Sequence, residues 1–134
     1  PQQIETILGG DVFIEQVAVI GNNRNYVTAI IAPNIEAIKG YAEQNGIKYE
    51  YVDELMDNPQ ICKMMEERIA ELQKDMAPYE KIKKFRMIKR GFTIESGELT
   101  STLKLRRAVI LQNYAAMIEE MYNPVQGPLG GYAK

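Results

Sequence analysis

The chain has no histidine, no tryptophan and a single cysteine, Cys62. Without histidine, the sequence excludes a Ser-His-Asp or Cys-His catalytic group and any zinc site that needs a histidine ligand. One cysteine cannot form an internal disulfide, and its place beside Ile61 on a helical stretch favours a small core residue over a nucleophile. Much of the common catalytic repertoire is therefore excluded.

Long apolar runs are also absent from the sequence. No stretch approaches the ~20 residues of a membrane helix, and the start of the chain lacks a basic segment followed by a hydrophobic one. We therefore expect no membrane or secretory segment in this chain. The first residue is Pro1 rather than methionine, and it leads directly into a helical pattern, so we expect a piece of a longer protein.

Charge is distributed unevenly along the 134 residues, although the net charge is only −2. The segment from Glu80 to Arg107 carries nine Lys and Arg against three Glu, a balance of +6, which leaves −8 for the rest. Such asymmetry can steer an anionic ligand or can be the solvated face of a strand pair. On charge alone, the solvated surface is the favoured interpretation.

A hairpin is predicted from Val12 to Pro33, because two β-branched runs flank the turn-forming sequence "GNNRN". Val17–Ile20 and Ala29–Ala32 are apolar at consecutive positions. Strands of this kind are buried on both faces, so we expect helices on both sides of the pair.

Helices are predicted after Asn34 and after Asn58, since both residues are good N-caps. The first should end at Gly46. The second carries one apolar stripe, formed by Ile61, Met65, Ile69, Leu72 and Met76. Further on, Phe85–Ile88 suits a strand and Phe92–Ile94 a second short extended piece, and a final helix carries Ile110 to Met121.

The strands are grouped rather than alternating with helices, which predicts an α+β domain with a small, largely antiparallel sheet flanked by helices. We place this domain at residues 1–122. Residues 123–134 are rich in Pro and Gly and predict a loose C-terminal tail.

Lys104, Arg106 and Arg107 crowd the start of the final helix, where the helix dipole makes cations unfavourable by a few tenths of a kcal/mol each. Free backbone N–H groups at a helix start attract anions, and added cations deepen that attraction. The preceding "LTST" could hold Lys104 out on a loop. The pattern indicates an exposed positive group aimed at an anion outside this domain, although a lone lysine at such a position is usually a surface residue.

The segment from Tyr79 to Arg107 resembles the closing part of AMP-forming long-chain fatty acid–CoA ligases, members of the adenylate-forming superfamily. Its "LTSTLKLRR" is similar to the family signature "LTPTLKLKR", with Ser101 where the family often has Pro. "PQQIETIL" and "QVAVIGNNRNYVTAIIAPN" resemble the opening of the same C-terminal domain, so the likeness runs from Pro1 to about Tyr122.

The resemblance implies a small C-terminal lid that rotates over a larger N-terminal domain between two half-reactions, acyl-adenylate formation and thioester formation with CoA. It implies that Lys104 is the catalytic lysine of the first step. Thr102, Arg106 and Arg107 are the candidates for nucleotide or CoA binding, and a surface role for the two arginines stays open. No residue is predicted to bind a metal.

ATP, CoA and a fatty acid are accordingly expected as substrates of the full-length enzyme, with Mg²⁺ entering together with ATP through the N-terminal domain. That domain is the expected partner, and nucleic acid is not expected. The isolated chain should bind no cofactor and be inactive. Its location should be cytoplasmic, with a full-length enzyme that could still associate with a membrane.

Two other functions stay open. The domain could be a non-catalytic interaction or regulatory module, which would tolerate a neutral replacement of Lys104. Less favoured is an anion- or nucleic-acid-binding module built on the +6 segment, because that segment offers few aromatic residues for base stacking, only Phe85 and Phe92, with Tyr79 at its edge. A steep salt dependence of its affinity for single-stranded DNA or RNA would support this alternative.

Overall fold

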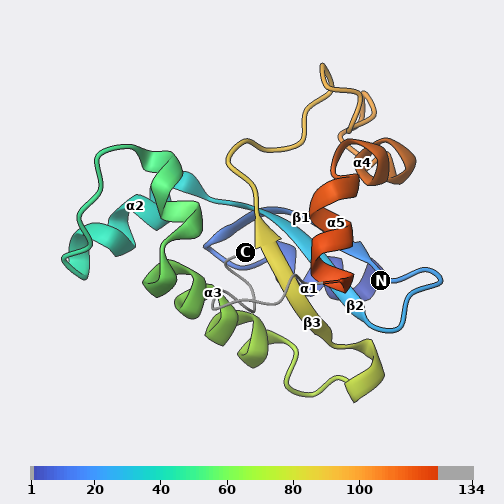
Figure 1. The fold of residues 1–134 in the computed structure, drawn as a ribbon, viewed down its shortest axis with the longest axis horizontal. Coiled ribbons are helices and arrows are strands. Elements are labelled where there is room, and N and C mark those ends of the chain that lie inside the picture. The colour runs from blue at the N-terminus through green and yellow to red at the C-terminus, as the bar shows by residue number, and fades with distance from the viewer. Residues whose placement is uncertain (1, 124–134) are drawn as a thin grey trace.

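The computed structural model describes residues 2–123, and over these residues it forms a three-stranded sheet with helices (Figure 1). The elements in chain order are α1 (Gln2–Gly9), β1 (Ile14–Ile20), β2 (Val27–Pro33), α2 (Ile35–Gln44), the 3₁₀ helix η1 (Val52–Asp57), α3 (Pro59–Leu72), the 3₁₀ helix η2 (Pro78–Glu80), β3 (Ile82–Met87), α4 (Arg107–Asn113) and α5 (Ala115–Tyr122). The α+β class is confirmed. The predicted loose tail lies, apart from Asn123, outside the described residues.

The sheet has the order β1-β2-β3 and is mixed. β1 and β2 form the predicted antiparallel hairpin, whereas β3 runs parallel to β2. A parallel neighbour requires a long crossover connection. Figure 1 shows that connection as the segment through α2, in teal, and α3, in green, which lies between β2 and β3 in the chain.

Both faces of the sheet are covered, as the sequence predicted. Because side chains alternate along a strand, successive residues of the hairpin enter different apolar clusters. The first cluster takes Val17, Val19, Ala29 and Ile31, and the second takes Ala18, Ile20, Ile30 and Ala32. Residues of α1, α2 and α3 complete the first cluster, and residues of α4 and α5 complete the second.

The two predicted N-caps are confirmed. The Asn34 side chain accepts a hydrogen bond from the Ala37 N–H at 3.2 Å, and Asn58 accepts from the Gln60 N–H at 2.9 Å. Gly46 follows α2 with a φ of +66°, a left-handed conformation that favours glycine. Each cap satisfies backbone donors that a helix start leaves without an internal partner.

Two predicted helices have different ends from those expected. α3 stops at Leu72, so the stripe is buried at Ile61, Met65 and Ile69 but Met76 lies beyond the helix. The final helix is broken at Tyr114, which has a φ of −113° and a ψ of 24°. α4 and α5 nevertheless contribute to the same second cluster. Cys62 is buried in the first cluster, which confirms its core role.

The prediction of a second extended piece at Phe92–Ile94 is wrong. Phe92 and Thr93 have no regular structure, and Ile94 begins a turn. The backbone of Phe92 pairs with a side chain instead of a strand: its N–H donates to Gln16 Oε1 at 2.7 Å, and its carbonyl accepts from Gln16 Nε2 at 3.0 Å. Gly91 makes this possible, since a Cβ there would lie 2.4 Å from Gln16 Oε1.

Across residues 2–123, no helix has both the length and the apolar character that a bilayer crossing requires.

Candidate functional site

The residues from Thr100 to Lys104, called the lysine loop below, form a closed turn between β3 and α4. Just outside it, Leu99 and Leu105 face each other in an isolated antiparallel bridge. The Thr100 N–H donates to the Lys104 carbonyl at 2.8 Å, and the Arg106 N–H donates to the Glu98 carbonyl at 2.8 Å. The two ends of the loop are therefore joined as in a small hairpin.

Leu103 gives the lysine loop an unusual backbone conformation. Its N–H donates to the Thr100 carbonyl at 2.8 Å, and its φ is +66°. A non-glycine residue in this left-handed region costs roughly 1–2 kcal/mol. The Leu103 residue is 65% exposed, so burial does not offset that cost. Backbone strain of this kind clusters at functional sites.

Hydroxyl groups fix the interior of the lysine loop. Thr100 Oγ1 accepts a hydrogen bond from the Lys104 N–H at 3.0 Å and lies 3.1 Å from Thr102 Oγ1. Thr102, predicted to bind a nucleotide or CoA, therefore has its hydroxyl engaged within the loop. Its ligand role stays a prediction.

Lys104 lies on an exposed loop, as its sequence context suggested. Its backbone is held at both ends by Thr100. Among the described residues, no hydrogen bond or ion pair reaches its ammonium group. The arrangement combines a fixed backbone with a cation that is available to a ligand outside this domain.

A buried acidic residue, Glu98, lies at the base of the lysine loop. Glu98 is 5% exposed, and its Oε2 accepts a hydrogen bond from Asn113 Nδ2 of α4 at 2.9 Å. Its charge acts on the neighbouring Tyr114, since burial and then the Glu98 carboxylate raise the pKa of that phenol. Glu98 thus connects the loop to the helix that follows it, a role that sequence inspection did not indicate.

The exposed Arg107 side chain is bound by groups of the same domain. Its Nη2 contacts both carboxylate oxygens of Glu5 on α1 at 2.5 Å, and its Nη1 donates to the Val19 carbonyl on β1 at 2.9 Å. Glu5 also accepts from the Val19 N–H at 2.8 Å. The cation at the start of α4 is therefore compensated by a carboxylate 102 positions away in sequence. This geometry supports the surface role left open for Arg107 rather than CoA binding.

Arg106 occupies the N-cap position of α4 without a side-chain capping bond and is exposed. It remains the better of the two arginine candidates for a ligand outside the domain. Other cations of the +6 segment have internal partners: Arg86 pairs with Glu120 at 2.8 Å and Arg90 with Asp53 at 3.8 Å. Part of the positive charge of that segment is thus balanced by carboxylates of the same domain.

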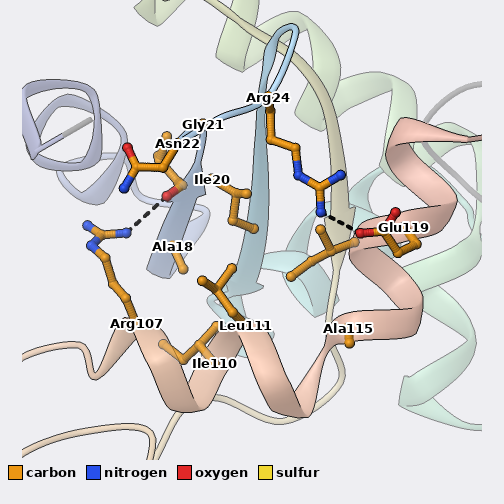
Figure 2. A pocket seen from close by; sticks show the side chains of 12 residues that line it. Ala18, Ile20, Gly21, Asn22, Arg24, Arg107, Ile110, Leu111, Ala115 and Glu119 are labelled. Carbon is orange, nitrogen blue, oxygen red and sulfur yellow. Dashed lines mark hydrogen bonds and ion pairs between the residues drawn. The ribbon is translucent and has the colours of Figure 1, made fainter.

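A cavity of about 250 Å³ lies between the end of β1 and the helices α4 and α5. Figure 2 shows Arg107 and Arg24 on opposite sides of it, with Arg24 paired to Glu119. The Arg24 guanidinium also lies 4.4 Å from the centre of the Tyr122 ring. Both arginines are neutralised from within the chain, and Lys104 is not among the lining residues, so this cavity is separate from the lysine loop.

Metal coordination has no visible basis in this part of the protein. Within residues 2–123, no three His, Cys, Asp or Glu side chains gather in a group that could hold an ion.

Comparison with known proteins identifies the family. Residues 1–126 match the AMP-binding enzyme C-terminal domain, and the chain belongs to this family. It is similar to a long-chain-fatty-acid–CoA ligase of Mycobacterium tuberculosis, with 29% identity over 92% of this chain and 21% of the relative. It is also similar to long chain acyl-CoA synthetase 4 of Arabidopsis thaliana, with 34% identity over 92% of this chain and 19% of the relative. The chain thus spans about a fifth of the length of these relatives.

A solved structure supports the same assignment. The adenylation domain of a carboxylate reductase from Mycobacterium chelonae superposes with a TM-score of 0.71 at 26% identity, over 91% of this chain and 17% of that one. The fold of this chain is therefore also present within the adenylation domain of a carboxylate reductase.

Proposed function

We propose that this chain is the C-terminal domain of a long-chain fatty acid–CoA ligase and that Lys104 supports ATP-dependent formation of the acyl-adenylate. The observation that carries the proposal is the exposed ammonium of Lys104, which no side chain or backbone group within residues 2–123 binds, next to the strained backbone of Leu103. The relative at 29% identity is named a long-chain-fatty-acid–CoA ligase, and the relative at 34% identity is named a long chain acyl-CoA synthetase.

The chemistry of adenylation explains the need for a cation. A fatty acid carboxylate must approach the α-phosphate of ATP, and both groups are anionic. An ammonium placed between them offsets the repulsion and favours the in-line approach. Lys104 supplies that charge, whereas ATP, its Mg²⁺ and the fatty acid would be held by the larger part of the protein.

The remaining expectations belong to the same proposal. The domain would act as a lid that closes the site for thioester formation with CoA, and exposed Arg106 is the candidate contact to CoA or to the N-terminal domain. A single lysine without a nucleotide pocket cannot hold either substrate. We therefore expect the isolated chain to be inactive.

The test uses the full-length protein that carries this domain and compares Lys104→Ala with wild type in the two half-reactions. ATP–pyrophosphate exchange should fall by about 10²–10³, the usual cost of losing such an electrostatic contact. CoA transfer from preformed acyl-adenylate should be retained, because that step does not need the Lys104 charge.

Lys89→Ala is the matched control, since Lys89 is another exposed lysine of the same segment. It should leave both half-reactions at the wild-type rate. If exchange persists in Lys104→Ala, the adenylation role is rejected and a non-catalytic domain becomes the better interpretation.

A further inference from the structure

We infer that Thr100 is the positioning residue for Lys104: its hydroxyl group fixes the backbone from which the ammonium is presented. This inference rests on the proposed adenylation role of Lys104. It adds a residue that acts through the lysine and does not itself need to touch a substrate.

Thr100 takes part in more contacts of the lysine loop than any other residue in it. Its N–H donates to the Lys104 carbonyl at 2.8 Å, and its carbonyl accepts from the Leu103 N–H at 2.8 Å. Its Oγ1 accepts from the Lys104 N–H at 3.0 Å and meets Thr102 Oγ1 at 3.1 Å. The two polar backbone groups of Lys104 are therefore both bound by Thr100.

The strained Leu103 shows why these bonds matter. A left-handed φ of +66° at an exposed leucine persists only when neighbouring contacts hold it. The backbone bonds to Thr100 close the turn on one side of Leu103. The hydroxyl bond to the Lys104 N–H fixes the peptide on its other side, so its loss would let the peptide before Lys104 rotate.

The hydroxyl has little to do with the stability of the fold. Its contacts are confined to the exposed loop, and neither apolar cluster includes Thr100. Removal of the hydroxyl should therefore change where the ammonium lies without unfolding the domain. Misplacement of a catalytic group by about 1 Å can cost up to about 10² in rate, and we expect about tenfold for this one bond.

The experiment uses the full-length protein with two conservative substitutions at Thr100. Thr100→Val removes the hydroxyl but keeps the β-branched shape, and Thr100→Ser keeps the hydroxyl. Thr100→Val should lower the kcat of ATP–pyrophosphate exchange about tenfold, with little change in KM, thioester formation or melting temperature. Thr100→Ser should stay near wild type. A merely structural residue would instead lower both half-reactions together with the melting temperature.

A double variant keeps the inference testable even where Thr100→Val lowers stability. If Thr100 acts only through Lys104, adding Thr100→Val to Lys104→Ala should lower exchange no further. An independent further loss overturns the inference, as does wild-type exchange in Thr100→Val or an equal loss in both Thr100 variants. These outcomes leave the proposed function standing, which fails separately if Lys104→Ala retains exchange.

Discussion

The lysine loop and the first turn of α4 are adjacent in sequence and both carry cations, but they hold them differently. Lys104 has an ordered backbone and, within the described residues, an ammonium without a partner. Arg107, three positions later, has its guanidinium bound by Glu5 and by the Val19 carbonyl. Of these two cations close to the start of α4, one is therefore balanced within residues 2–123 and the other is not.

This difference helps to separate function from stability. A cation that is compensated inside the domain contributes to the fold, because it joins elements that are distant in sequence. A cation without such compensation, carried on a strained loop, makes no visible contribution to the fold, and we propose that it serves an anion outside the domain. Substitutions that affect only one of these two properties test the comparison.

The largest effect on stability is expected at a second arginine that resembles Arg107. Arg68 Nη2 and Nε donate to Asp11 at 2.6 and 2.9 Å, and the Asp11 side chain is only 4% exposed. Asp11→Asn in the 134-residue chain should lower the free energy of unfolding at pH 7 by about 2–3 kcal/mol. Urea unfolding measures the change.

The same variant should alter the response to acid. Burial alone would raise the pKa of Asp11, but hydrogen bonds from Arg68 and the Phe13 N–H outweigh burial and leave it below its ordinary value of 3.8. Stability from the ionised carboxylate is present above that value and is lost as pH falls below it. Asp11→Asn should flatten this acid loss. Asp75→Asn, at an exposed carboxylate, is the control, and an unchanged acid slope in Asp11→Asn would contradict the prediction.

A double-mutant cycle on Glu5 and Arg107 should give the next largest effect. Glu5→Gln and Arg107→Met should each lower the free energy of unfolding by about 1–2 kcal/mol, a range reduced for solvent screening because the Arg107 side chain is 43% exposed. The coupling between them should be about 1 kcal/mol. Additive losses in the double variant would show that the pair does not act as a unit.

Leu103 should respond to backbone shape rather than to loss of contacts. Leu103→Gly relieves the left-handed strain but increases the freedom of the unfolded chain, so stability should stay within about 0.5 kcal/mol of wild type. Leu103→Val should cost about 1 kcal/mol, because a β-branched residue tolerates a positive φ poorly. Equal stability of the two variants would mean that the strain at residue 103 is not significant.

The smallest effect is expected at Lys104 itself. Lys104→Ala should change the free energy of unfolding by less than about 0.5 kcal/mol, as for surface substitutions without contacts. Thermal unfolding beside Arg107→Met provides the direct comparison. A loss above about 1 kcal/mol would place Lys104 in the structural group with Arg107.

Local sequence signals predicted the local features of this fold well. The caps at Asn34 and Asn58 and the two hairpin strands are encoded within a few residues of where they occur. Continuous apolar runs also predicted that the sheet is covered on both faces. The parallel pairing of β3 could not be predicted in this way, because strand periodicity does not specify which neighbour a strand joins or in which direction.

The candidate site shows the same division. Lys104 could be found from its place before the final helix, together with the family signature. The Glu5–Arg107 pair could not, because its members are 102 positions apart. The break at Tyr114 and the pairing of Gln16 with Phe92 likewise depend on tertiary packing. Thr100 and Leu103 are part of the signature, but their hydrogen bonds and backbone angles cannot be predicted from residue identity alone.

The pairing of Gln16 with Phe92 has a mechanical consequence. β1 and β3 are the two edge strands of the sheet. The side-chain amide of Gln16 on β1 forms two hydrogen bonds with the backbone of Phe92, a few residues after the end of β3. Further along, the bridge between Leu99 and Leu105 closes the base of the lysine loop, and the buried Leu99 belongs to the apolar cluster on one face of the sheet. The segment that carries Lys104 is thus connected to the sheet by hydrogen bonds and by apolar packing. We therefore expect a large displacement of that lysine towards a neighbouring domain to move the sheet as well as the lysine loop.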